Sequence, residues 1–230
     1  MSKIGVLSAC TLLVAAGAAN AAITGAMWVE VPNATWSPTG TAPSADPIAG
    51  AAWSANPYRT FDLMLLGSAG DQVNGVNIGG AAADPYQINT GGGTIFNHSA
   101  GGDQRSFNLE ALFSAIGFDT YATYGGNDTT NGQPFGGFAG TVNMTGAGGV
   151  IRFSSFAAAG DPAEVGANGM LRVFRVSVAN FNESVGGSGS LEVGLPGGAL
   201  AVFQVGPWVP TPGAAALFGL AGVAGLRRRR

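Results

Sequence analysis

The sequence predicts an all-β protein, a single β-sandwich of about ten short strands with one short helix. Glycine makes up 39 of the 230 residues, and glycine pairs such as Gly91-Gly92 and Gly148-Gly149 recur where turns are expected. Between these pairs lie short runs rich in β-branched and aromatic residues, which favour strands. Short strands separated by glycine turns at this spacing are typical of a sandwich.

The predicted strands follow one another along the whole central region. In chain order they span residues 26–31, 60–66, 72–78, 86–89, 118–124, 138–144, 150–156, 170–179, 190–194 and 200–205. Successive side chains of a strand point to opposite faces of its sheet. In the run 170–179, Phe174 therefore shares a face with Arg172, whereas Arg175 and Ser177 lie on the other face, which we expect to be the more hydrated one.

One short helix is expected over residues 109–116. Asn108 can cap its start, Leu112 and Ile116 lie on one apolar stripe, and Gly117 ends it. The preceding segment 32–57 contains five prolines and is expected to be a long surface loop or an irregular edge of the sandwich. We find no linker within residues 22–206, so this region is expected to be one domain, large enough to bury a core.

The first 21 residues have the layout of a secretory signal peptide. Lys3 precedes an apolar stretch over residues 4–19, which ends in small residues. The expected cleavage region comprises Ala19, Asn20, Ala21 and Ala22. This pattern predicts entry into the general secretion machinery. Cys10, the single cysteine of the chain, lies inside the peptide, so the exported protein is expected to have no disulfide and no thiol nucleophile.

The charge of the central region excludes several partners. Between Lys3 and the terminal arginines, five arginines stand against thirteen acidic residues, which gives this region a net charge of −8. A protein with this charge is not expected to bind nucleic acid or an anionic membrane surface.

Residues 207–230 consist of three consecutive parts. The motif Val209-Pro210-Thr211-Pro212 comes first, and an apolar run of thirteen residues, 214–226, follows it. The last part is the basic cluster Arg227, Arg228, Arg229 and Arg230. As a helix the apolar run would span about 20 Å, against about 30 Å of bilayer hydrocarbon. Because the run has no polar face, we expect a hydrophobic helix that contacts the membrane transiently and does not pack on the domain.

The order of these three parts resembles the PEP-CTERM sorting signal. The resemblance implies export by a bacterium that makes exopolysaccharide, and recognition and removal of the segment by an exosortase, a membrane-embedded protease. It also implies a transient stay at the inner membrane before the protein reaches the cell envelope or the extracellular matrix. The family usually has glutamate where this chain has Thr211. Two stretches of the central region, TFDLMLLGSAGDQVNGVNI and LEALFSAIGFDTYATYGG, resemble secreted proteins that often carry the same signal, and this resemblance implies no activity.

No catalytic residues are predicted, and the chain is not expected to be an enzyme. His98 is the single histidine, and it lies beside Ser99 and Asp103 in what we expect to be a polar surface loop. A catalytic triad is assembled by the fold from distant segments, so this local adjacency argues against one. A glycosidase pair of carboxylates is the alternative that the sequence leaves open. The acids to consider for it are Asp119, in a predicted strand, and then Glu183 and Glu192.

Two binding sites are considered from the residues, one for a cation and one for sugars. The loop 127–132 is rich in side-chain oxygens, which suit Ca²⁺, but it lacks alternating acids, so no cofactor is expected. Trp36 and Trp53 lie in the proline-rich segment and could stack on sugar rings; the alternative is that they cover an edge of the fold. We therefore expect an exported protein with a structural or adhesive role, with a carbohydrate-binding module for exopolysaccharide and a glycan-active enzyme as the alternatives.

Overall fold

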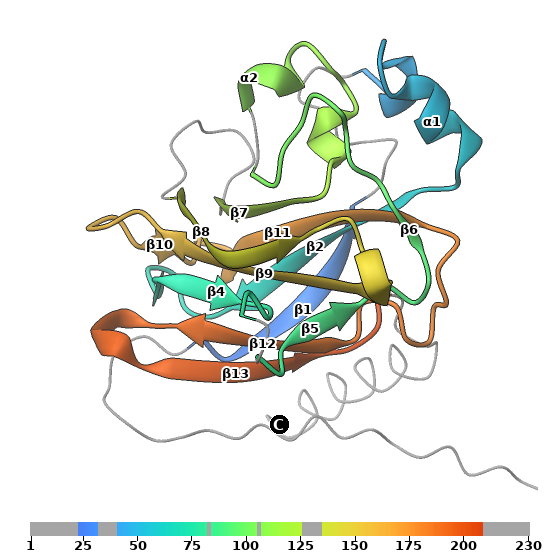
Figure 1. Cartoon of the computed structure of the whole chain (residues 1–230). Coiled ribbons are helices and arrows are strands. Elements are labelled where there is room, and N and C mark those ends of the chain that lie inside the picture. Colours follow the sequence, from blue (N-terminus) through green and yellow to red (C-terminus); the bar gives the residue numbers. More distant parts are fainter. Residues whose placement is uncertain (1–22, 32–40, 82–83, 105–106, 126–134, 209–230) are drawn as a thin grey trace, which may run out of the picture.

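The computed structural model describes residues 23–31, 41–81, 84–104, 107–125 and 135–208 (Figure 1). These residues form a mostly β protein, which confirms the predicted class. Their strands are distributed over three sheets. This distribution does not by itself establish a single sandwich.

The first large sheet is built around β11, the longest strand of the described ranges. Strands β1, β2 and β11 lie side by side, and β6 and β7 both pair with the other edge of β11. All these pairs are antiparallel. The bounds are β1 Gly25–Val31, β2 Arg59–Leu66, β6 Thr94–Ile95, β7 Tyr121–Gly125 and β11 Met170–Ala179.

The second large sheet has the order β13-β12-β4-β9-β8, with β5 bridging β12 and β9. A small third sheet pairs β3 with β10. The bounds are β3 Gln72–Val73, β4 Gly75–Asn77, β5 Gln87–Asn89, β8 Phe135–Asn143, β9 Val150–Ala157, β10 Ala163–Glu164, β12 Gly189–Gly194 and β13 Leu200–Val205.

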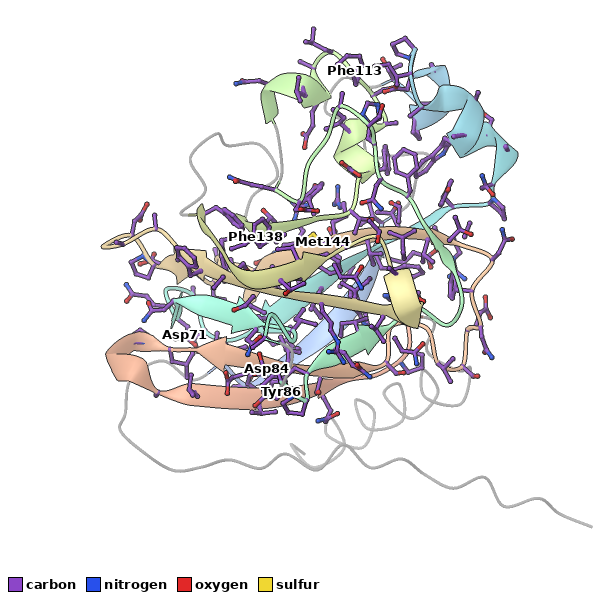
Figure 2. The ribbon with its side chains drawn as sticks, in the orientation of Figure 1. Asp71, Asp84, Tyr86, Phe113, Phe138 and Met144 are labelled. Carbon is purple, nitrogen blue, oxygen red and sulfur yellow. The ribbon has the colours of Figure 1, made fainter. Side chains whose placement is uncertain are left out.

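The two large sheets share one apolar core. Alternate residues of β2 and β11 point into it from one sheet, and alternate residues of β9 and β12 from the other. The rings of Phe153 and Phe174 meet across the sheets with centroids 5.0 Å apart. Phe138 and Met144, at the β8 side of the molecule, also pack on this core (Figure 2). Because the apolar faces bury each other, this cluster is the main source of stability.

A cap of short helices and loops covers the other face of the sheet around β11 (Figure 1). It has its own apolar cluster, in which the ring of Trp53 packs against Tyr58, Phe96 and Phe118. Its helical elements are η1 Pro43–Ala45, α1 Gly50–Ala55, α2 Phe107–Glu110 and η2 Ile116–Phe118. Two further 3-10 turns, η3 Ala147–Gly149 and η4 Pro196–Gly198, lie in connections of the second large sheet. The face that the cap covers is therefore not a hydrated one.

The predicted helix 109–116 is wrong. The structure has the single turn α2 and, after a further turn, η2. The N–H of Ala115 donates to the carboxylate of Asp46 at 2.9 Å, so this amide does not form the internal bond that a continued helix would give it. Leu112, expected on the buried stripe, is 68% exposed.

Other segments also differ from the expectation. The predicted strand 118–124 begins only at β7, because η2 occupies residues up to Phe118. The predicted strand 72–78 is divided between two sheets as β3 and β4. The proline-rich segment, expected to be a loop, contains η1 and α1.

Residues 1–22 and 209–230 lie outside the described residues, and with them the predicted signal peptide and the predicted hydrophobic helix. Within the described ranges, no helix has the length and apolar character that crossing a membrane requires.

Candidate functional site

The candidate site is a layer of buried polar groups between the sheet around β11 and the cap. Thr60 and Asp62 alternate with core residues on β2, and Arg175 and Ser177 do so on β11. The strand register places Asp62 opposite Arg175 and Thr60 opposite Ser177. Polar side chains therefore meet in pairs on the face that the cap covers.

The expectation of a hydrated face for Arg175 and Ser177 is wrong, because both are 0% exposed beneath the cap. The expectation that Arg172 shares a face with Phe174 is also wrong. A β-bulge between these two residues shifts the register, and with it Arg172 and Arg175 both reach the same partner, Asp62. A bulge inserts one residue and so changes the face of everything beyond it.

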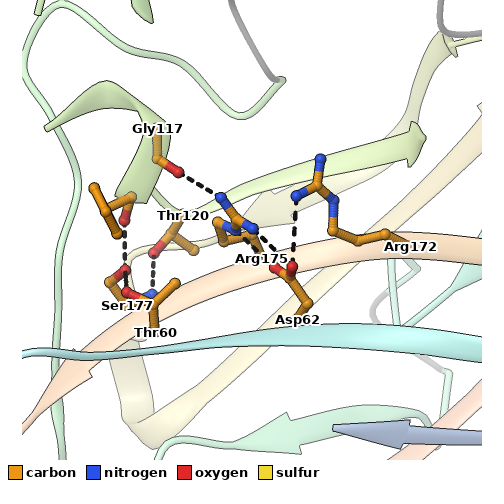
Figure 3. Close-up of polar contacts among 8 residues, drawn as sticks. Thr60, Asp62, Gly117, Thr120, Arg172, Arg175 and Ser177 are labelled. Carbon is orange, nitrogen blue, oxygen red and sulfur yellow. Dashed lines mark hydrogen bonds and ion pairs between the residues drawn. The ribbon is translucent and has the colours of Figure 1, made fainter. Parts of the chain in front are cut away.

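Asp62 lies at the centre of a buried ion cluster (Figure 3). Arg175 donates to its two oxygens from Nε and Nη2, at 2.6 and 2.7 Å, which is the bidentate geometry of a strong pair. Arg172 Nη1 lies 3.4 Å from Oδ2. Arg175 also donates from Nη1 to the carbonyl of Gly117 at 2.7 Å. The cluster thus connects β2 and β11 to η2 in the cap.

Burial raises the pKa of the Asp62 carboxyl, but the positive charges and hydrogen bonds of Arg175 and Arg172 outweigh that effect and leave this pKa below its ordinary value. Asp62 therefore stays ionised at neutral pH. Both guanidinium groups also lie near the ring of Tyr121, with the Cζ atoms of Arg172 and Arg175 at 6.0 and 5.9 Å from its centroid.

A row of hydroxyl groups continues the layer. Thr60 and Ser177 share a hydrogen bond of 2.7 Å, and Ser177 donates to the carbonyl of Phe118. Thr120 donates to the carbonyl of Phe96 at 2.8 Å. These bonds satisfy carbonyl groups of the cap that burial would otherwise leave unpaired.

Asp119 is the second buried aspartate of the layer, at the end of η2. Its Oδ1 accepts the backbone N–H groups of His98, at 2.8 Å, and of Thr120, at 2.9 Å. Its Oδ2 lies against Gly101, so closely that a β-carbon built on that glycine would be 1.9 Å away. Asp119 is only 2% exposed.

The environment of Asp119 has an electrostatic effect opposite to that of Asp62. Burial raises the pKa of Asp119 to about 7, the two amide hydrogen bonds lower it only in part, and the nearby charge of Asp103 raises it further. A carboxyl with this pKa changes between its neutral and its ionised form near neutral pH. That property suits a general acid or a proton-controlled contact.

His98 connects this aspartate to the rest of the cap. Its Nδ1 accepts the N–H of Ala100 at 3.1 Å, which leaves the proton on Nε2, 3.2 Å from Asp46 Oδ1. Asp46 also accepts the amides of Ile48, Ala49 and Ala115, each at 2.9 Å. Burial raises the pKa of Asp46, but these amide bonds and the bond from His98 lower it below its ordinary value.

The prediction that His98 lies in a polar surface loop is wrong, since the residue is 4% exposed. Both ring nitrogens of His98 are engaged within the cap. Its neighbours Ser99 and Asp103 are exposed. The local Ser-His-Asp adjacency is therefore not assembled into a triad.

The other predicted acids lie apart from this layer. Glu183 is exposed and forms an ion pair with Arg59 at 3.0 Å. Glu192 accepts a hydrogen bond from the hydroxyl of Tyr86 at 3.2 Å on the outer face of β12. Neither is brought to Asp119 by a contact in the described residues.

Of the two predicted sugar-stacking residues, the described ranges contain Trp53. Trp53 is 8% exposed and stacks on Tyr58 with a centroid distance of 5.1 Å, so it presents no free ring to a sugar. Trp36 lies outside the described residues, and so do the loop considered for Ca²⁺, the cleavage region and the sorting motif with its arginines. Among the residues described, no three His, Cys, Asp or Glu side chains are grouped as a metal site would need.

The sequence analysis did not identify Asp46 or Asp62, nor the pairing of Arg172 and Arg175 of β11 with Asp62. Two arginines within a run of ten otherwise mostly apolar residues were an available signal of a buried ion pair, because charges are rarely buried unpaired. Asp46 carried a weaker signal, a position just before a helix, where aspartate often bonds to free amides.

Comparisons with protein-family models, with curated proteins and with solved structures gave no match to this chain.

Proposed function

We propose that this chain is an exported structural or adhesive protein of a bacterial cell envelope or extracellular matrix, delivered through residues 207–230. One observation carries the proposal: a Pro-containing motif, a short apolar run and four arginines follow one another in that segment. An exosortase-like protease would recognise and remove the segment. The body would be a single sandwich of the two large sheets, with the cap on one side.

The packing of Trp208 supports removal of the tail without loss of the fold. This residue directly precedes the motif, is 2% exposed, and stacks on Phe61 with a centroid distance of 5.7 Å. Its backbone N–H donates to the carbonyl of Gly186 at 2.7 Å. The core thus extends two residues beyond the predicted domain end at 206, and cleavage after Trp208 would leave it intact.

The buried polar layer supports a structural role. The exported protein would have no cysteine for disulfides, and the ion cluster of Asp62 joins two strands and the cap much as a cross-link would. Arg175 fixes the relative position of these elements, because it is hydrogen-bonded both to Asp62 and to the carbonyl of Gly117.

The proposal is tested with two epitope tags on one chain, one inserted in the exposed turn η4 and one after Arg230. We expect the η4 tag in the envelope or the medium and separation of the terminal tag in a host with an exosortase. The control is the same chain in a host without that protease, where both tags should remain together. Both tags on one uncleaved inner-membrane protein in the exosortase host would overturn the proposal.

A glycan-active hydrolase is a second candidate, favoured by one observation. The pKa of Asp119, raised to about 7 by burial, is in the range of a glycosidase general acid. The test is release of reducing sugars from the exopolysaccharide of the host, with Asp119→Asn as the inactive comparison. Equal release by both proteins, or none by either, would exclude this role.

A further inference from the structure

We propose that the segment 96–103 is a proton-controlled lid, which closes over Asp119 when its carboxyl is neutral and opens when it is charged. This inference does not depend on export through the tail.

The segment is attached at its two ends and lies over Asp119 between them. At one end the backbone N–H of Phe96 donates to the carbonyl of Ser177 at 2.8 Å. At the other end the backbone carbonyl of Asp103 accepts the N–H of Ala122 at 2.8 Å. Between them, His98 donates its N–H to Asp119, and Gly101 lies directly on Oδ2. Because Ser99 and Gly102 are exposed, this segment alone separates Asp119 from solvent on that side.

Asp119 meets no positive charge in the described part of the chain. Arg172 and Arg175 are directed at Asp62, Arg59 at Glu30 and Glu183, and Arg152 at Gln87. The imidazole of His98 is directed at Asp46, and Asp103 contributes a charge of the same sign. A buried carboxylate with only two amide donors is therefore costly when ionised.

Ionisation of Asp119 and opening of the lid favour each other. Water reaching Oδ2 would remove the desolvation that keeps the proton on the closed state. The pKa of about 7 places this change near neutral pH. The two glycines 101 and 102 offer the chain backbone freedom where the lid must lift. Opening would expose Asp119 and His98 together to solvent.

The test is amide hydrogen exchange of the full chain at two pH values, corrected for the intrinsic pH dependence of exchange. With a closed-state pKa of about 7 and an ordinary value near 4 in the open state, the opening equilibrium should rise on the order of 30-fold between about pH 5.5 and about pH 8.5. The rise is expected at the amides of His98 and Gly101. The amide of Val176 in β11 reports global unfolding, which ionisation of Asp119 also makes pH-dependent. The amides of His98 and Gly101 should show a larger opening equilibrium than Val176 at both pH values, as local opening of the lid requires.

Two variants make the test specific. Asp119→Asn, which keeps the acceptor and cannot ionise, should abolish the 30-fold rise, whereas Asp71→Asn, a buried aspartate away from the cap (Figure 2), should retain it. Asp103→Asn, at an exposed position, should move the midpoint to lower pH. The same rise in Asp119→Asn as in the wild type, or no rise in the wild type, would overturn the proposal.

Discussion

Asp62 and Asp119 are two aspartates buried in the layer between the sheet around β11 and the cap, and their surroundings have opposite effects on their pKa values. Asp62 accepts a bidentate pair from Arg175 and is approached by Arg172, and its pKa lies below the ordinary value. Asp119 accepts two backbone amides, and its pKa is raised to about 7. The burial is similar, so the presence of a cation decides the direction.

The comparison separates two uses of a buried charge. The Asp62 carboxylate has both arginines as partners in its ionised form, so the cluster holds β2, β11 and η2 together over a wide pH range. Asp119 is best accommodated when neutral, so the contact it holds changes with pH. One face of a sheet thus combines a permanent connection with a variable one.

The largest expected effect comes from breaking the permanent connection. Asp62→Asn removes the negative charge and leaves Arg175 and Arg172 buried without it, which should lower the free energy of unfolding by about 3–5 kcal/mol. Urea unfolding at neutral pH measures it. In the wild type the contribution is present above the ordinary pKa and is lost as the pH falls through the lowered folded-state pKa. A loss below about 1 kcal/mol, as for a surface pair, would mean that the cluster is not a main connection.

The second prediction is a gain in stability, expected for Asp119→Asn above neutral pH. Because the folded-state pKa of Asp119 is raised, its contribution falls as the pH rises from about 4 to about 7 and is then constant. Asp119→Asn stays neutral, so at about pH 8 it should be more stable than the wild type, by about 4 kcal/mol at most. Urea unfolding of both proteins at about pH 5 and about pH 8 measures the difference, which should fall to about 1.5 kcal/mol at the lower pH. Destabilisation at both pH values would contradict the assigned direction.

The two aspartates were not equally visible in the sequence. The alternation of apolar and polar residues predicted the bounds of β2 and β11 closely, because core residues such as Phe61 and Val176 follow a period of two. The same alternation assigned Arg175 and Ser177 to water, since a period of two cannot distinguish solvent from a second layer that covers the outer face. The cap that covers them arises from segments with mixed periodicity, and its pairing with the sheet depends on contacts between distant residues.

The candidate site shows the same limit. Asp119 was selected as an acid to consider, but its buried state depends on Gly101 and His98, which reach it from another segment. His98 itself was assigned to a surface loop from its polar neighbours, and its bonds to Asp119 and Asp46, 21 and 52 residues away, place it inside. The bulge at Arg172 leaves no mark in a single sequence, so the convergence of both arginines on Asp62 was not predictable.

A smaller effect is expected at the contact between Gly101 and Asp119. In Gly101→Ala the new methyl group would lie 1.9 Å from Oδ2, so the segment must shift, at a cost of about 1–3 kcal/mol. Thermal or urea unfolding measures the cost. The matched control is the same substitution in an Asp119→Ala background, where the clashing atoms are absent and the change should be close to neutral. Equal costs in the two backgrounds would show that the close approach is not what requires glycine there.

The smallest expected effect is at the hydroxyl row that continues from Asp62 towards Asp119. Ser177→Ala removes the donor to the carbonyl of Phe118 and the partner of Thr60, and should cost about 1–2 kcal/mol, because buried polar groups lose their partners. The double variant Thr60→Val with Ser177→Ala should cost less than the sum of the two single changes, since the hydroxyls form one bond with each other. Urea unfolding of the four proteins measures this coupling. Strict additivity would mean that the row is a set of independent bonds, and that the cap is connected to the sheet mainly through Asp62.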